Sequence, residues 1–316
     1  MNTIHTHTNG WFKFSCSLTV LVIGCFFLSP LMADQQTEDR SDSENHRQQI
    51  ENWRASRHKR LTRPDGWLTL VGLEWLNEGE NRIGSAADND IRLTGGAAYW
   101  GSVFLENDRL SFTSSMENGV KINGEAIAQA ELIPESRGEV SLVSNGSLSF
   151  YVIFRGSYGL RIKDSQAKAL LNFEGVENYP VDESWRIDGR FTRAEEGTVI
   201  EIANVLGQVS DLSVYGTFEF EMNGKTHSLL GLGTAKSEKL WFIFADRTSG
   251  RGTYGAGRFL YSDGMPENGR LTLDFNKAYN PPCAFNPYST CPLPPGRNRM
   301  DLMVTAGEKD FHPGSA

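Results

Sequence analysis

Alternation of apolar and polar residues runs through most of the chain after Pro64 and predicts β-strands. In the segment 218–222 two phenylalanines and a methionine point to one side, and two glutamates point to the other. Five Asn-Gly pairs interrupt these runs, and each can supply the two positive-φ residues of a tight hairpin turn. The pairs are Asn118-Gly119, Asn123-Gly124, Asn145-Gly146, Asn223-Gly224 and Asn268-Gly269. The pattern predicts a mainly β protein, with two β-sandwich or partly closed barrel units and a short N-terminal helix.

The N-terminus carries an apolar segment of a different kind, at residues 14–28. Lys13 precedes this segment and the small residue Ala33 follows it, an order that is typical of a secretory signal peptide. The segment is shorter than the roughly 20 residues that a membrane-spanning helix needs. We therefore predict that 1–33 is a signal peptide, and that the mature protein is exported, periplasmic or extracellular, with no transmembrane anchor. A lipoprotein anchored at Cys25 is the alternative.

A polar stretch follows, and it ends in the densest group of cations in the chain. We predict a polar linker and a helix within residues 34–63, with the helix at about 44–59, because no Gly or Pro interrupts that segment. The cations are Arg54, Arg57, His58, Lys59, Arg60 and Arg63. Such residues are typical of the C-terminal end of a helix, whose dipole they complement. An anion site is the alternative interpretation.

Two β units are expected after this helix, at residues 64–155 and 156–312. The first contains the segments 80–93 (ENRIGSAADNDIRL) and 119–127 (GVKINGEAI), which resemble the turns and strands of a forkhead-associated β-sandwich. That family recognises phosphothreonine through an Arg after the Ile-Gly turn and a downstream Ser-x-x-His. Here Ser85 follows the Gly, and no His lies between His58 and His227. The resemblance therefore implies the shape of the fold and not phosphothreonine binding.

Six further segments resemble a bacterial and archaeal family known as domain of unknown function 1684. They are GWLTLVGLEWLNEGENRIGS at 66–85, NFEGVENYPVD at 172–182, FADRTSGRGTYGAGRFL at 244–260, LDFNKAYNPPCAF at 273–285, CPLPPGRN at 291–298 and AGE at 306–308. Their order and spacing fit from about Trp53 to Glu308. The resemblance implies membership of that family, and it implies no chemistry, because no activity is attached to the family.

Polar residues gather around the end of one central strand in the second β unit. Residues 240–246 (LWFIFAD) are apolar on both faces until the terminal Asp, and a glycine-rich turn then leads to a strand that bears Arg258. We predict a polar site here, formed by Asp246, Thr253, Tyr254, Arg258, Asp274, Asn276, Asn280, Asn298 and Glu308. These groups could bind an anion or a hydroxyl-rich ligand. The alternative is a buried network in which Arg258 pairs with Asp246 or Asp274.

Cys283 and Cys291 are the only cysteines after the predicted signal peptide, and they flank a proline-rich loop. In an exported protein a pair of cysteines typically forms a disulfide, which we predict here. Closing so short a loop stabilises a fold by roughly 2–3 kcal/mol. Two buried thiols, or a metal or catalytic pair, are the alternatives. The spacing differs from the CxxC motifs of zinc and redox sites, so we predict no metal and no cofactor.

Charge and motifs limit the function. The formal net charge of −8 argues against a nucleic-acid partner, which needs a basic surface. The leading hypothesis is an exported cell-envelope protein that binds a small-molecule, glycan or peptide ligand or has a structural role. The alternative is a hydrolase or lyase that acts on an envelope glycan or peptide through paired carboxylates, with Asp246, Asp274 and Glu308 as candidates. The sequence leaves the oligomeric state open.

Overall fold

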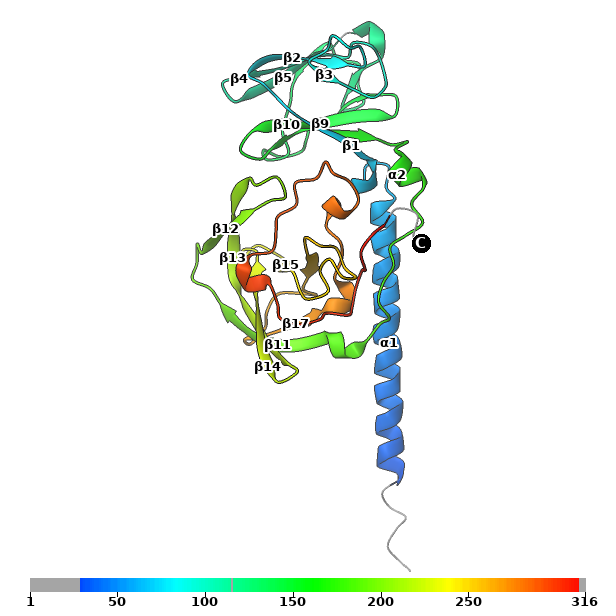
Figure 1. Ribbon diagram of the computed structural model, residues 1–316, viewed down its shortest axis with the longest axis vertical. Coiled ribbons are helices and arrows are strands. Elements are labelled where there is room, and N and C mark those ends of the chain that lie inside the picture. Colours follow the sequence, from blue (N-terminus) through cyan, green and yellow to red (C-terminus); the bar gives the residue numbers. More distant parts are fainter. Residues whose placement is uncertain (1–28, 115, 313–316) are drawn as a thin grey trace, which may run out of the picture. The chain divides into compact units, whose positions relative to one another are not determined.

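The computed structural model describes residues 29–114 and 116–312. The apolar segment of the predicted signal peptide and Cys25 lie outside the described residues. The chain divides into two compact units, Met1–Asn45 and His46–Ala316, and the second unit holds every strand and every candidate site residue. The protein is mainly β, as predicted, with several sheets and one helix near the N-terminus (Figure 1).

Helix α1 spans Ser29–Leu61, so it begins well before residue 44, where the sequence placed its start. The extension has a simple cause, because no Gly or Pro occurs between Pro30 and Pro64 to stop a helix. Within the second unit one face of α1 is buried, since Ile50 and Leu61 are almost fully covered. The 11-residue spacing of these two residues keeps them on the same side of a helix with 3.6 residues per turn.

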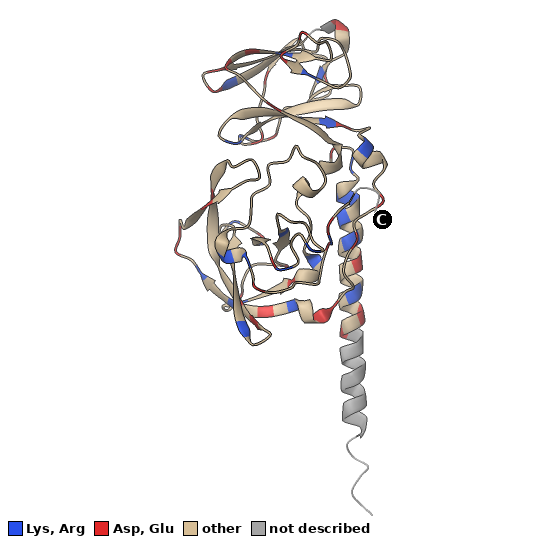
Figure 2. Cartoon of the chain, in the orientation of Figure 1, with Lys and Arg blue, Asp and Glu red and all other residues tan. Residues whose placement is uncertain are grey.

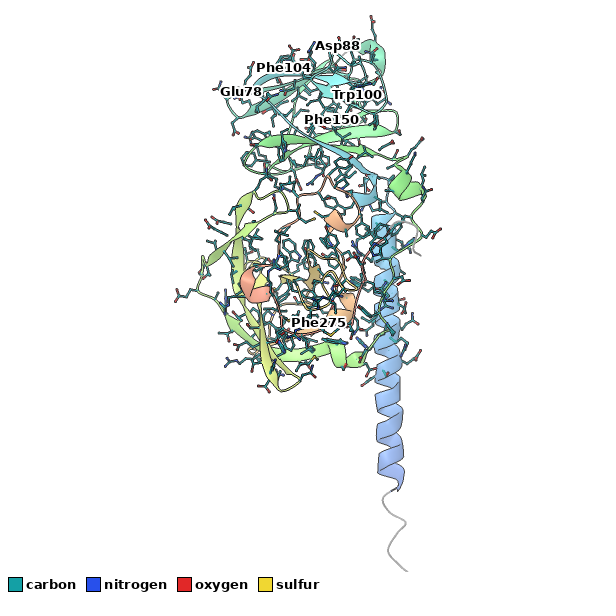
Figure 3. The ribbon with its side chains drawn as sticks, in the orientation of Figure 1. Glu78, Asp88, Trp100, Phe104, Phe150 and Phe275 are labelled. Carbon is teal, nitrogen blue, oxygen red and sulfur yellow. The ribbon has the colours of Figure 1, made fainter. Side chains whose placement is uncertain are left out.

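The first β unit is a sandwich of two five-stranded sheets. One sheet has the order β1-β10-β9-β8-β6, formed by Leu70–Trp75, Tyr158–Asp164, Leu148–Phe154, Val143–Asn145 and Lys121–Ile122. The other has the order β3-β2-β4-β5-β7, formed by Ile91–Arg92, Gly79–Gly84, Gly101–Glu106, Arg109–Ser114 and Gln129–Glu131. One hydrophobic core joins both sheets, and Trp100 and Phe150 lie within it (Figure 3). The sandwich includes β10 and therefore extends past residue 155 to Asp164.

The second β unit is a curled half-barrel of seven strands. Its order is β16-β15-β14-β13-β11-β17, and β12 pairs with β13. The strands are β11 Arg186–Arg193, β12 Val199–Ala203, β13 Val209–Met222, β14 Lys225–Leu232, β15 Trp241–Phe244, β16 Arg258–Tyr261 and β17 Arg270–Asp274. Phe242 and Phe244 join one core cluster, around Phe275, and Ile243 joins another. Strand β15 is therefore buried on both faces, as its continuous apolar run predicted.

Short helical turns connect these strands. They are the helix α2 (Lys168–Leu171) and the 3-10 turns η1 (Trp67–Thr69), η2 (Met116–Asn118), η3 (Glu183–Trp185), η4 (Phe275–Lys277), η5 (Pro282–Ala284) and η6 (Gly296–Asn298). The last two lie in the proline-rich loop and each begins directly after a proline that has extended backbone angles. The rigid prolines therefore set the course of this loop.

Three of the five Asn-Gly pairs form the predicted turns. Both residues have positive φ at Asn123-Gly124, Asn223-Gly224 and Asn268-Gly269, as a type I′ turn requires. At Asn118-Gly119 and Asn145-Gly146 only the glycine has positive φ. The Asn145 side chain instead accepts from the amide of Ala97 and donates to the carbonyl of Asn118, so it ties neighbouring loops together.

Candidate functional site

Strand β15 leads to Asp246, which forms a buried ion pair with Arg258 at the start of β16. Arg258 Nη2 lies 3.0 Å from Asp246 Oδ2, and neither side chain is exposed by more than 1%. The guanidinium also donates to the backbone carbonyls of Val304, Ala306 and Glu308. Burial lowers the pKa of Arg258, and the charge of Asp246 opposes that shift. The predicted bond between Arg258 and Asp246 is therefore present.

The other oxygen of Asp246 fixes the turn that follows the strand. Oδ1 accepts from the amide of Thr248 at 2.8 Å and from its hydroxyl at 2.6 Å. The Thr248 hydroxyl lies 2.9 Å from that of Thr253, which is fully buried. Oδ1 also accepts from the amide of Val304. Both oxygens of Asp246 are thus engaged in holding the chain.

Asp274 and Asn276 form a second polar group where β17 ends. Asp274 Oδ1 accepts from both the amide and the side chain of Asn276, and Oδ2 lies 2.7 Å from His46 Nε2. Asn276 also bonds both backbone groups of Asp182. This carboxylate therefore connects helix α1, the end of β17 and the segment before β11.

Glu308 forms the third group, with Arg57 of α1. Arg57 Nε donates to Glu308 Oε1 at 2.9 Å, and the amide of Asn280 donates to Oε2 at 2.7 Å. The Asn280 side chain donates to the carbonyl of Lys309. Asn298 lies elsewhere in the same unit, where its side chain bonds Leu230 and Ile243 of strands β14 and β15.

Cys283 and Cys291 lie side by side as free thiols. The amide of Cys283 is 3.1 Å from Cys291 Sγ, and the amide of Cys291 is 3.3 Å from Cys283 Sγ. The hydrogen bond between the two thiols lowers the pKa of Cys283 and raises that of Cys291. Tyr254 adjoins the pair, since its hydroxyl donates to the carbonyl of Cys283, and burial raises the pKa of this phenol to about 12. The structure contains no disulfide between the two cysteines.

The nine predicted site residues thus lie in one unit, seven of them in three bonded groups and Tyr254 and Asn298 outside these groups. Most of their polar atoms have protein partners, and Arg258 Nε and Asn280 Oδ1 are buried without one. None of the nine lines the larger cavity of the described chain, and Glu308 alone lines a smaller one. His46 and Arg57 complete two of the three groups, and the sequence did not assign them that role. Both lie on α1 with the buried Ile50 and Leu61. This pattern of buried positions along the helix is the sequence signal that could have identified them.

The larger cavity has a volume of about 870 Å³ and is lined by cations and aromatic rings. Its cations come from α1, from the hairpin β9–β10 and from the half-barrel. They are Arg57, Arg60, Arg63, Arg155, Arg161, Lys163, Lys239 and Lys277, against the three carboxylates Asp65, Glu135 and Asp263. Figure 2 shows Lys and Arg along the described end of α1. In a protein with a formal charge of −8, this wall is a local concentration of positive charge.

Arg161 of β10 is the most deeply buried cation of this wall. Its side chain is 2% exposed, and it donates to the hydroxyls of Tyr151 and Thr290 at 3.1 and 3.2 Å. Its Nε is buried without an acceptor. The nearest carboxylate oxygen, of Glu135, lies at 3.8 Å and also pairs with Arg155 at 3.2 Å. The positive charge of Arg161 is therefore only partly compensated.

Comparisons with known proteins identify relatives without a stated activity. The family described as "Protein of unknown function (DUF1684)" matches residues 171–309. The chain is also similar to an uncharacterized protein of Haloarcula marismortui, solved by solution NMR. The identity is 30%, the match covers 43% of this chain and 77% of that one, and the TM-score is 0.37. No curated protein matches.

Within 29–114 and 116–312 no helix combines the length and hydrophobicity of a membrane span. No group of three or more His, Cys, Asp or Glu side chains in the same ranges is arranged to hold a metal ion.

Proposed function

We propose that this chain, a member of the DUF1684 family of proteins of unknown function, is an exported ligand-binding protein of the cell envelope. Its ligand is a small organic anion, and the binding site is the cationic cavity. The signal-peptide pattern of residues 1–33 supports export. In an oxidising compartment the adjacent Cys283 and Cys291 would then close into the disulfide that the sequence predicted.

The observation that carries this proposal is the only partly compensated charge of the buried Arg161. A buried donor without an acceptor costs about 1–3 kcal/mol, and more when the group is charged. The Nε of Arg161 is such a donor in the wall of an open cavity. An anionic ligand in the cavity supplies negative charge close to this guanidinium, and guanidinium groups are well suited to bind carboxylate or phosphate.

The size and lining of the cavity agree with a small-molecule ligand. Its volume of about 870 Å³ falls within the range of roughly 300–1,000 Å³ that is common for ligand pockets. Tryptophan and tyrosine rings make up much of the remaining wall, including Trp53, Trp67 and Trp241. Large rings cover apolar parts of a ligand, and their polar atoms can bond it.

The hydrolase or lyase alternative gains no support from the three predicted carboxylates. Asp246 is paired with Arg258, Asp274 is bonded to His46, and Glu308 is paired with Arg57. All three side chains are at most 2% exposed. A general acid or base must reach its substrate, whereas these groups are enclosed by the protein.

Tryptophan emission tests the proposal, since three tryptophans line the cavity. The protein is titrated with orthophosphate, sulfate and citrate at low ionic strength, where screening is weak. We expect a saturable change in emission with at least one anion. Arg161→Met should abolish it, and Arg109→Gln, which alters an exposed arginine of β5 outside the cavity, should leave it unchanged. The absence of a saturable change in the wild type would refute the proposal.

A further inference from the structure

The cations of the cavity differ in how far their charges are already neutralised. Four of them have a carboxylate partner within 3.2 Å. The pairs are Arg57 with Glu308, Arg63 with Asp65, Arg155 with Glu135, and Lys277 with Asp263. Among the described residues no carboxylate lies within 4 Å of the charged groups of Arg60, Lys163 or Lys239. With Arg161, these are the charges that remain for a ligand.

Arg161 and Lys163 form the first anion-binding position. They are two residues apart on β10 and so project from the same face of the sheet. The Arg161 guanidinium and the Lys163 ammonium lie 5.8 and 5.0 Å from the centre of the Tyr151 ring. Lys163 Nζ donates only to the backbone carbonyl of Asp65. Burial lowers the pKa of Lys163; the charge of Asp65 opposes this shift, and the charge of Arg161 adds to it. An anion between the two cations would therefore relieve their repulsion.

Arg60 forms a second position on a different element, helix α1. It is an exposed residue at the edge of the cavity. Burial of part of its guanidinium, and then repulsion by Arg57, lowers its pKa. Arg57 itself is held by Glu308 and lies 4.6 Å above the Tyr279 ring. The two positions therefore belong to separate elements and can contact separate groups of one ligand.

The aromatic part of the wall presents ring edges and hydroxyls. Trp241, Tyr261 and Tyr279 are packed against one another with ring planes only 16° and 14° apart. One face of Tyr279 is covered by Arg57, and Trp241 packs against Phe259 at 4.9 Å. Burial raises the pKa of Tyr279, and the hydroxyls of Tyr261 and Tyr279 are hydrogen-bonded to each other. The tyrosine hydroxyls of this wall can bond the hydroxyl groups of a ligand.

We infer that the ligand carries two separated anionic groups on a hydroxylated body, as a sugar bisphosphate or a sugar with two acidic groups does. One group binds at Arg161 and Lys163, and the other binds at Arg60. This inference rests on the proposed function. It adds that the ligand has two anionic groups and that each group binds to a different element of the fold. Multidentate binding of this kind gains affinity because the second contact becomes intramolecular once the first has formed.

Matched probes test the inference by calorimetry. The wild type is titrated with fructose 6-phosphate and with fructose 1,6-bisphosphate, and we expect the bisphosphate to bind at least tenfold more tightly. Arg60→Gln should remove this advantage and leave the affinity for the monophosphate unchanged. Arg161→Met should weaken both, and a thermal melt of that variant shows whether it is folded. Arg109→Gln is the control and should behave as the wild type.

The outcomes separate the two proposals. Equal affinities of the wild type for the two sugar phosphates, or an undiminished advantage in Arg60→Gln, would overturn the inference of two anionic positions and leave the anion cavity in place. A failure of every anion to bind would overturn the proposed function as well. The corresponding dicarboxylate, glucaric acid, extends the series, and stronger binding of glucarate than of gluconate would assign the charged groups to carboxylates.

Discussion

Replacement of Arg258 should destabilise the protein strongly without changing its affinity for anions. Arg258→Met keeps much of the side-chain volume and removes the partner of Asp246 and the donors for three carbonyls. Breaking a buried pair on one side costs about 3–5 kcal/mol, because the other charge stays buried without its partner. We expect a loss near ~4 kcal/mol, a large share of the 5–15 kcal/mol that typical domains have.

That loss corresponds to a measurable shift of the thermal midpoint. The unit His46–Ala316 has an unfolding entropy on the order of 0.6 kcal/mol/K, from ~2.1 cal/mol/K per residue. A loss of ~4 kcal/mol then lowers the midpoint by about 7 °C. Arg82→Gln breaks the exposed pair with Asp90 and serves as the control, whose midpoint should stay close to that of the wild type.

A double-mutant cycle tells whether the pair itself is responsible. Asp246→Asn keeps an oxygen that can accept from Thr248 and Val304 and removes the negative charge. Combined with Arg258→Met it leaves no isolated charge, so the double variant should be more stable than the sum of the single effects predicts. Strictly additive effects, or a midpoint of Arg258→Met equal to that of the wild type, would refute the reasoning. A loss of orthophosphate binding with unchanged stability would assign Arg258 to the ligand site.

Two further predictions concern export and the cysteines. Protein recovered from the periplasm or medium should begin at or near Asp34, because the apolar segment is short and ends before the small residue Ala33; N-terminal sequencing that finds Met1 or a lipid on Cys25 would contradict export by a cleaved signal. Exported protein that is denatured without reductant should show no titratable thiol, since Cys283 and Cys291 are adjacent. Protein prepared under reducing conditions should show two thiols. Two thiols in both samples would exclude the disulfide.

Much of the fold could be predicted from local patterns. The hairpin turns at Asn123-Gly124, Asn223-Gly224 and Asn268-Gly269 depend on a backbone angle that two particular residue types tolerate, so the dipeptide predicted them. The same dipeptide did not give two positive φ angles at Asn145-Gly146, where the Asn145 side chain bonds neighbouring loops. The pair of Arg258 and Asp246 was also predictable, because one residue follows a central strand and the other begins the neighbouring strand.

The cavity could not be predicted in the same way. Its cations are contributed by α1, by β10 and by the segments around β15 and η4, and nothing in a sequence shows that those segments meet. The arginines around Arg57 were attributed mainly to the dipole of the helix, which is the common explanation for cations at that place. In the structure Arg57 is bonded to Glu308 and Arg60 lines the cavity, so these two arginines have tertiary surroundings that the helix dipole does not predict.

The family match and the proposed binding site cover different parts of the chain. The matched residues 171–309 contain Asp246, Arg258 and the carboxylates that are closed within the protein, together with the tyrosine side of the cavity. Of the cavity cations that lack a close carboxylate partner, Arg60, Arg161 and Lys163 precede residue 171, and Lys239 lies within the matched segment. The buried groups also depend on residues outside the matched segment, because His46 bonds Asp274 and Arg57 pairs with Glu308. Helix α1 therefore contributes both to the buried network of the half-barrel and to the wall of the cavity.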